Sequence, residues 1–157
     1  MRLKGSVYEM NDLTKLYQLV VNHELATFKN EVLDTTRIKK KLLAFLNDVS
    51  EVGELTHVYT FWEHDQNIVH EEVLETYVEG MSILMSIGYE MRIDEVRTSQ
   101  EIPETIPLED LLFAIYQNAI ILKNTYDPLV YQDLLDDYFH LGFRLGISLE
   151  EIVNSYE

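Results

Sequence analysis

The sequence predicts an all-α protein with a four-helix-bundle core and flanking helices. Apolar residues recur at helical spacing along most of the 157 residues, and strand-like alternation is almost absent. Six glycines and three prolines leave few turn signals, so the helices are expected to be long. With 46% hydrophobic residues and no shift in composition, the chain is expected to form one domain over residues 1–157.

The N-terminal part predicts two helices. Asn11 or Asp12 can cap a first helix that runs to about Leu33. The Asp-Thr-Thr cluster at 34–36 ends it and can cap a second helix over about 37–62. The first turn of this second helix is basic, which is unfavourable beside a helix N-terminus. Its lysines are therefore expected to be solvated, or to meet a partner such as a phosphate.

A polar stretch at 63–67 leads to a third helix that reaches about Met91. Residues 92–107 have no periodicity and form a long connection, which is either a lid or a linker. Pro107 then suits the first position of a fourth helix over about 108–124.

The C-terminal part predicts two more helices. Asp-Pro at 127–128 ends the fourth helix, and a fifth follows over about 129–145. Ser148 and Glu151 match a capping box, so a short last helix begins at Ser148.

Charge narrows the possible functions. Twelve basic against 28 acidic residues give a formal net charge of −16, which should repel a nucleic-acid backbone and attract cations. There is no cysteine, so disulfides and thiol chemistry are excluded. The N-terminus lacks a signal-peptide pattern and no stretch resembles a membrane span, so a cytoplasmic protein is expected.

Two groups of acids have spacings that suggest a site. Glu51 and Glu54 are three residues apart, and Glu72, Glu75 and Glu79 follow at spacings of three and four. Such spacings bring side chains to one face of a helix, so two packed helices can aim several carboxylates into one volume. Both segments are apolar around the acids, and partly buried like charges need a counter-cation. A hard divalent cation such as Mg²⁺ fits this ligand set, whereas the simpler interpretation is a solvated acidic face.

Two glycines lie inside these predicted helices, where each costs about 1 kcal/mol relative to alanine. Gly53 and Gly80 are adjacent to Glu54 and Glu79. A glycine in a helix often marks close approach of another backbone, so the second and third helices are expected to touch near their acids.

Other polar residues carry weaker signals. His57, His64 and His70 are spaced by seven and six residues, which suits solvated or capping histidines better than a transition-metal site. Gln18 and Asn22, four apart on the first helix, could read the edge of a pyrimidine base.

Several motifs together resemble one family. They are Glu-x-Gly-Glu-Leu at 51–55, Tyr-Thr-Phe-Trp at 59–62, Leu-Glu-Thr-Tyr-Val-Glu-Gly at 74–80 with the segment 81–88 that follows, and the closing segment 141–152. They resemble the all-α dimeric dUTP pyrophosphatases, which belong with the MazG-like enzymes to a larger group of all-α nucleotide pyrophosphatases.

The resemblance implies a magnesium-dependent hydrolase that converts a nucleoside triphosphate, dUTP being the suggested substrate, to the monophosphate and pyrophosphate. Glu51 and Glu54 would be the first metal pair and act in catalysis, with Glu75 and Glu79 as further metal ligands. Trp62 would stack on the base, although a lone tryptophan is more often part of the core. The resemblance also implies a homodimer.

Some positions depart from the family pattern. Thr76 stands where a glutamate is expected, Thr60 where a lysine is expected, and Ser82 where histidine is frequent. The basic segment that follows the closing helix in the family is not found before Glu157. Less positive charge near the phosphates weakens transition-state stabilisation. Two alternatives therefore stay open: a catalytically degenerate homologue that acts as a dimeric binding or regulatory protein, and a plain acidic helical scaffold.

Overall fold

The computed structural model describes residues 10–27, 35–96 and 106–156. These ranges hold six helices and no strand, so the all-α prediction is confirmed. None of the helices there combines the length and the apolar character that crossing a membrane requires. The helices are α1 (Met10–Thr27), α2 (Thr35–Leu55), α3 (His70–Glu90), α4 (Leu108–Thr125), α5 (Pro128–Arg144) and α6 (Leu149–Asn154).

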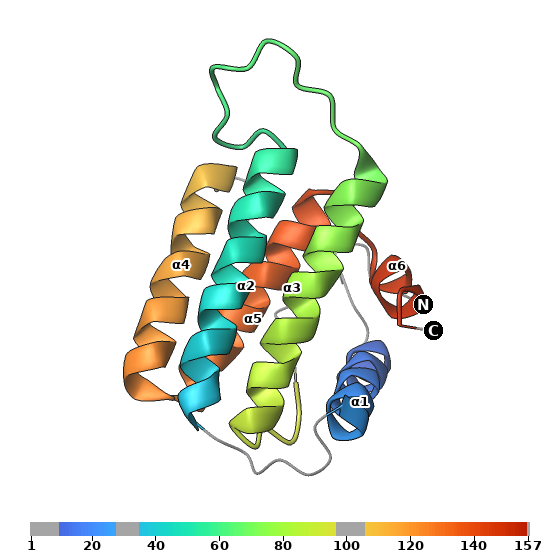
Figure 1. Ribbon diagram of the computed structural model, residues 1–157, viewed down its shortest axis with the longest axis vertical. Helices are drawn as coiled ribbons and strands as arrows, with labels where there is room; N and C mark the ends of the chain where they lie inside the picture. Colours follow the sequence, from blue (N-terminus) through green and yellow to red (C-terminus); the bar gives the residue numbers. More distant parts are fainter. Residues whose placement is uncertain (1–9, 28–34, 97–105, 157) are drawn as a thin grey trace.

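Four of these helices form the bundle core (Figure 1). Helix α2 packs against α3 and α4, and α5 packs against α3 and α4. The two remaining helices, α1 and α6, contact each other and the flank of α3. This arrangement confirms the predicted four-helix core with flanking helices.

Two tyrosines fix the register of α3 against α5. The rings of Tyr77 and Tyr138 stack with their centroids 4.4 Å apart and their planes 5° apart. Each hydroxyl donates to the other residue's carbonyl oxygen, at 2.8 Å from Tyr77 and 2.7 Å from Tyr138. Gly80 and Gly142 lie against these hydroxyls, and a Cβ at either glycine would overlap a tyrosine. The glycines are therefore what allows the two helices to approach so closely.

Helix boundaries agree with the sequence pattern except at the start of α1 and after α2. Helix α1 begins at Met10, so Asn11 and Asp12 lie inside it and the prediction that one of them caps it was wrong. The second helix was expected to reach Trp62 but ends at Leu55. Beyond it the Thr56 hydroxyl donates to the Val52 carbonyl at 2.8 Å, and His57 adopts a left-handed conformation with φ of 60°, which an α-helix cannot continue through. The predicted extension of the first helix to Leu33 lies outside the described residues.

The other ends lie close to their predicted positions. Helix α3 ends at Glu90, α4 begins at Leu108, and α5 ends at Arg144. The capping box that begins α6 is present, with reciprocal hydrogen bonds between Ser148 and Glu151. Pro107 occupies the N-cap position of α4 rather than its first helical position.

The basic first turn of α2 has a partner within the fold. The guanidinium of Arg37 lies 2.6 Å from a Glu90 carboxylate oxygen, and the ammonium of Lys41 lies 3.6 Å from it. Glu90 is buried at the end of α3. Two of the four basic side chains thus hold the start of α2 to the end of α3, while Lys39 and Lys40 are exposed.

Candidate metal and nucleotide site

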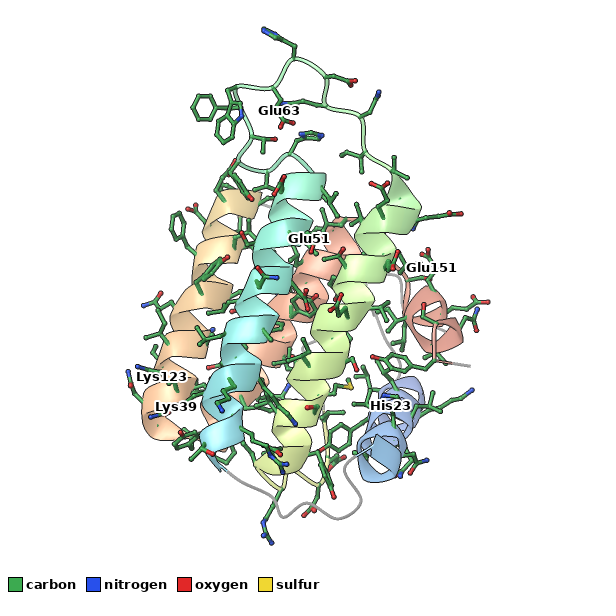
Figure 2. The ribbon with its side chains drawn as sticks, viewed as in Figure 1. His23, Lys39, Glu51, Glu63, Lys123 and Glu151 are labelled. Atoms are coloured by element: carbon green, nitrogen blue, oxygen red, sulfur yellow. The ribbon has the colours of Figure 1, made fainter. Side chains whose placement is uncertain are left out.

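A buried aspartate lies on α2 where this helix approaches α3 closely. Asp48 is only 4% exposed, and its Oδ2 atom has no hydrogen-bond partner among the described residues. Glu51 follows on the next turn of α2, in the half of the helix that leads to the α2–α3 loop (Figure 2). An unpaired buried carboxylate oxygen is costly, so it demands an explanation.

The electrostatics of Asp48 show which acids surround it. Burial and, after it, the negative charges of Glu79 and Glu51 together raise the pKa of Asp48 from its usual value of 3.8 to about 6. Glu79 belongs to α3 and Glu51 to α2. Three carboxylates from two helices therefore share one electrostatic neighbourhood, in which the two glutamates disfavour the ionisation of Asp48.

Gly80 and Tyr138 form the base of this acid cluster. A Cβ at Gly80 would lie 3.3 Å from the Cβ of Asp48, so α2 and α3 approach closely here. Burial raises the pKa of the Tyr138 hydroxyl well above its usual value, with Asp48 as the largest charge contribution. The prediction that Gly80 marks contact between the second and third helices is confirmed. Gly53 instead faces Tyr59 and Leu112, so the contact predicted for it was wrong.

The remaining predicted ligands are less closely associated. Glu54, Glu75 and Glu72 have exposed side chains, whereas Thr76 is buried. Within the described part of the chain, no three Asp, Glu or His side chains are grouped so that they could hold a metal ion together. The ligand roles of Glu51, Glu54, Glu75 and Glu79 thus stay a prediction.

The groups present nevertheless suit a hard cation. The acids near Asp48 offer carboxylate oxygens, which Mg²⁺ prefers, and Mg²⁺ commonly keeps several waters and takes only one or two protein carboxylates. The unpaired oxygen of Asp48 offers a ligand without breaking a hydrogen bond. A bound cation would also offset the negative charges of Glu79 and Glu51, which add to burial in raising the pKa of Asp48.

The predicted base-reading residues lie elsewhere in the chain. The Gln18 amide donates to the Asn22 side-chain oxygen at 3.0 Å, and both residues are exposed on α1. Among the residues that the structure describes, helix α1 contacts α3 and α6, and no contact with α2 is found. Within one chain, this amide pair is therefore not part of the acid cluster, and its role in base binding stays a prediction.

Trp62 lies in the α2–α3 loop at the same end of the bundle as Glu51. It is 60% exposed and makes an edge-on contact with Phe61, at a centroid distance of 5.1 Å. The interpretation of Trp62 as a core residue was therefore wrong. Exposed aromatic rings of this kind can stack on a base.

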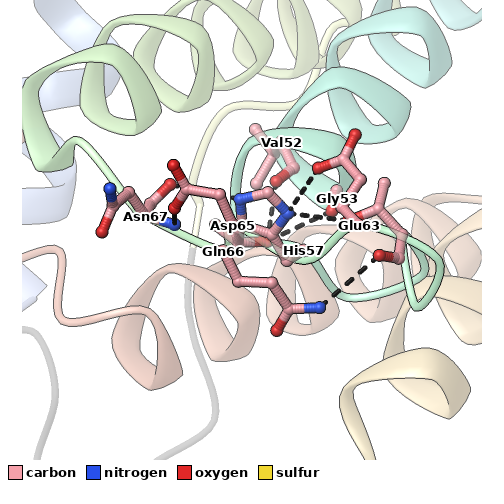
Figure 3. Close-up of polar contacts among 9 residues, drawn as sticks. Val52, Gly53, His57, Glu63, Asp65, Gln66 and Asn67 are labelled. Atoms are coloured by element: carbon pink, nitrogen blue, oxygen red, sulfur yellow. Dashed lines mark hydrogen bonds and ion pairs between the residues drawn. The ribbon is translucent and has the colours of Figure 1, made fainter.

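His57 organises this loop (Figure 3). Its Nδ1 atom lies 2.7 Å from the Thr60 hydroxyl and 3.1 Å from a Glu63 carboxylate oxygen, and its Nε2 atom lies 3.1 Å from the Asn67 carbonyl oxygen. Because a carbonyl only accepts, Nε2 carries a hydrogen in this arrangement. The sequence interpretation of His57 as solvated or capping missed this role in joining both ends of the loop.

Asp48 is the functional candidate that sequence reasoning missed. It stands three residues before Glu51, the same spacing that drew attention to Glu51 and Glu54. Asp48 is also next to Val49, which lies on the apolar face of α2. This position was the signal in the sequence that Asp48 is more buried than Glu51 or Glu54.

The comparison with protein families covers almost the whole chain. The family model described as dUTPase matches residues 11–157. The chain belongs to the dUTPase family. Neither the curated proteins nor the solved structures contain a significant match. Membership in the dUTPase family agrees with the all-α architecture and with the resemblance found in the motifs around Glu51 and Glu79.

Proposed function

We propose that this dUTPase-family protein is a magnesium-dependent nucleoside triphosphate pyrophosphatase that releases a nucleoside monophosphate and pyrophosphate. Its family makes dUTP the first substrate to test. The observation that carries the proposal is Asp48, a buried carboxylate with an unpaired oxygen and a pKa raised to about 6 beside Glu51 and Glu79. Perturbed acids of this kind are typical of functional sites rather than of solvated helix faces.

In this proposal the cation binds Asp48 together with Glu51 or Glu79 and keeps several waters. Glu75, which is exposed on α3, is a further candidate ligand. Bound magnesium would neutralise phosphate charge and orient the triphosphate. Glu54 is exposed on the turn after Glu51, so this pair can position the attacking water and accept its proton.

The exposed ring of Trp62 would stack on the base, since its loop joins the two helices that carry the acids. Gln18 and Asn22 remain candidates for reading the base edge.

The test is pyrophosphate release from a panel of nucleoside triphosphates that includes dUTP, with magnesium and with chelator. We expect turnover that disappears with chelator and in Glu51→Gln and Glu79→Gln. Glu71→Gln removes an exposed acid from the first turn of α3 and is the matched control, with turnover expected to be unchanged. Turnover that persists in chelator, or in both site variants, would contradict the proposal.

A degenerate binding protein is the second candidate. It is favoured by the burial of Thr76 where the family pattern has a glutamate, and by the lack of a complete ligand group among residues 10–27, 35–96 and 106–156. Nucleotide binding without turnover on the same panel would identify it. In either case we propose that the protein acts as a homodimer.

A further inference from the structure

A polar cavity of about 320 Å³ lies between α4 and α5, which follow each other in the chain and pack together (Figure 1). Its volume is within the range of roughly 300 to 1,000 Å³ that is usual for small-molecule sites. Four of its lining side chains can carry charge, and they come from both helices: Asp110 from α4, and Asp137, His140 and Arg144 from α5. None of them belongs to the acid cluster on α2 and α3, so the cavity is a separate candidate site.

Asp137 is the first residue of α5 to line the cavity. Asn118 on α4 donates to its Oδ2 atom at 2.8 Å, which places these two residues at one level of the helix pair. Burial, helped by the charges of Asp133 and Asp136 and opposed by the hydrogen bond from Asn118, raises the pKa of Asp137 from its usual 3.8 to about 6. A carboxylate has acceptor positions beyond the one that Asn118 uses. A ligand cation at these positions would offset the cost of the buried charge.

Arg144 lies at the other end of the cavity. It is the last residue of α5, seven residues after Asp137, which at 1.5 Å per residue is roughly 10 Å along the helix. Its guanidinium donates to the carbonyl oxygen of Ile106, just before α4, and this bond holds the group at the cavity. A guanidinium has several N–H donors in one plane, so donors remain that can pair with a carboxylate.

Asp110 lies near the Arg144 end and not near Asp137. It is in the first turn of α4, eight residues before Asn118, which is roughly 12 Å along α4 from the level of Asp137. The oxygen ligands of a metal ion lie within about 2 to 2.6 Å of it, so two short acids this far apart cannot share one ion. The cavity therefore offers two separate places for positive charge.

The middle of the cavity is apolar on its α4 side. Leu111 and Ala114 line it there, between the levels of the two acids, and Leu111 is buried. His140 lines the α5 side, three residues after Asp137 and on the same face of the helix. An aliphatic chain suits the α4 wall, because it loses no hydrogen bond to water on binding there.

We infer that this cavity binds a free α-amino acid with a basic side chain, for which lysine is the simplest model. The ligand's carboxylate pairs with Arg144 and its α-ammonium with Asp110, at the end of the cavity where both residues lie. Its methylene chain runs along Leu111 and Ala114, and its side-chain ammonium reaches Asp137. Each charged group of the ligand then meets a group of opposite charge. The net charge of −16 also attracts a ligand whose own net charge is positive.

Isothermal titration calorimetry of the full chain, with chelator and without nucleotide, tests the ligand class. We expect L-lysine to bind, and analogues that lack one of its charges to bind at least about 10-fold more weakly. The analogues are L-norleucine without the side-chain ammonium, cadaverine without the carboxylate, and Nα-acetyl-L-lysine without the charge on the α-nitrogen. The last also represents a lysine at the C-terminus of a peptide. No detectable binding of L-lysine, or an analogue that binds as tightly as L-lysine, overturns the inference.

Substitutions in the same assay test the position of the ligand. Asp137→Asn should weaken the binding of L-lysine at least about 10-fold and leave that of L-norleucine unchanged, because norleucine has no charge to pair with this carboxylate. Arg144→Gln should likewise weaken L-lysine and leave cadaverine unchanged. Glu109→Gln is the matched control, since Glu109 is exposed on the same turn of α4 as Asp110 but does not line this cavity.

Unchanged affinity for L-lysine in Asp137→Asn or Arg144→Gln, or an equal loss in Glu109→Gln, overturns the inference. Far-ultraviolet circular dichroism checks that each variant is helical, and the analogues decide on the native chain if a variant does not fold. Neither measurement involves turnover, so the result is independent of the proposed function.

Discussion

Replacing Asp48 by asparagine tests the central feature of the site. The folded-state pKa of Asp48 is raised to about 6 from its usual 3.8, so the folded protein holds this proton more tightly than the unfolded chain does. The free energy of unfolding should therefore fall as the pH rises from about 4 to about 6, and this loss should be complete above pH 6. An asparagine side chain does not ionise, so the Asp48→Asn variant should lack this loss.

The magnitude follows from the raised pKa. A rise in pKa from 3.8 to about 6 means that ionised Asp48 destabilises the folded protein by about 3 kcal/mol at neutral pH. Solvent screening at the exposed glutamates Glu51 and Glu79 reduces this, and we expect about 1 to 2 kcal/mol. Any cost of packing the asparagine amide is the same at every pH. The change, between pH 4 and pH 7, in the difference in free energy of unfolding between the variant and the native protein therefore reports the charge of Asp48 alone.

The assay is urea unfolding of both proteins in chelator at several pH values, followed by far-ultraviolet circular dichroism. Asp48→Asn should gain stability relative to the native protein between pH 4 and pH 7. Magnesium at 100 times its dissociation constant should add about 2.7 kcal/mol to the native protein at pH 7 and much less to the variant. A stability difference that is equal at pH 4 and pH 7 would refute the reasoning, and equal stabilisation by magnesium would remove Asp48 from the proposed ligands.

Substitutions at three further positions test how the fold supports the site, each by urea unfolding. The free energy of unfolding of Gly142→Ala should be about 1 to 3 kcal/mol lower than that of the native protein, because the added Cβ overlaps the Tyr77 hydroxyl. This loss is expected although alanine has the better helix propensity. A variant as stable as the native protein, or more stable, would show that α3 and α5 can separate at no cost. Glu90→Gln should lower the free energy of unfolding by about 2 kcal/mol or more, because it removes the carboxylate that pairs with the Arg37 guanidinium. Adding 0.5 M salt to the native protein should not cause the same loss, since salt screens a buried ion pair poorly. Ser148→Ala should cost about 1 kcal/mol through the lost cap of α6, and Ser148→Asp should recover most of it.

Much of the fold could be read from local patterns. The capping box at Ser148 and the start of α4 after Pro107 depend on neighbouring residues alone, so the sequence was sufficient to predict them. The end of α2 was not predictable in this way. The apolar stretch continues to Trp62, and it is the left-handed turn at His57, held by contacts with Glu63 and Asn67, that ends the helix.

The sequence by itself determined the all-α class, the spacing of Glu51 and Glu54, and the acidic character of the α2–α3 region, because periodicity and charge are properties of the chain. Only the tertiary structure showed that Asp48 is the buried acid and that Tyr138 and Gly80 lie beneath it. The physical reason is that burial and pKa depend on which helices pack together. A three-residue spacing brings Asp48 and Glu51 to one side of α2, but the packing of α3 and α5 decides which of the two is buried from solvent.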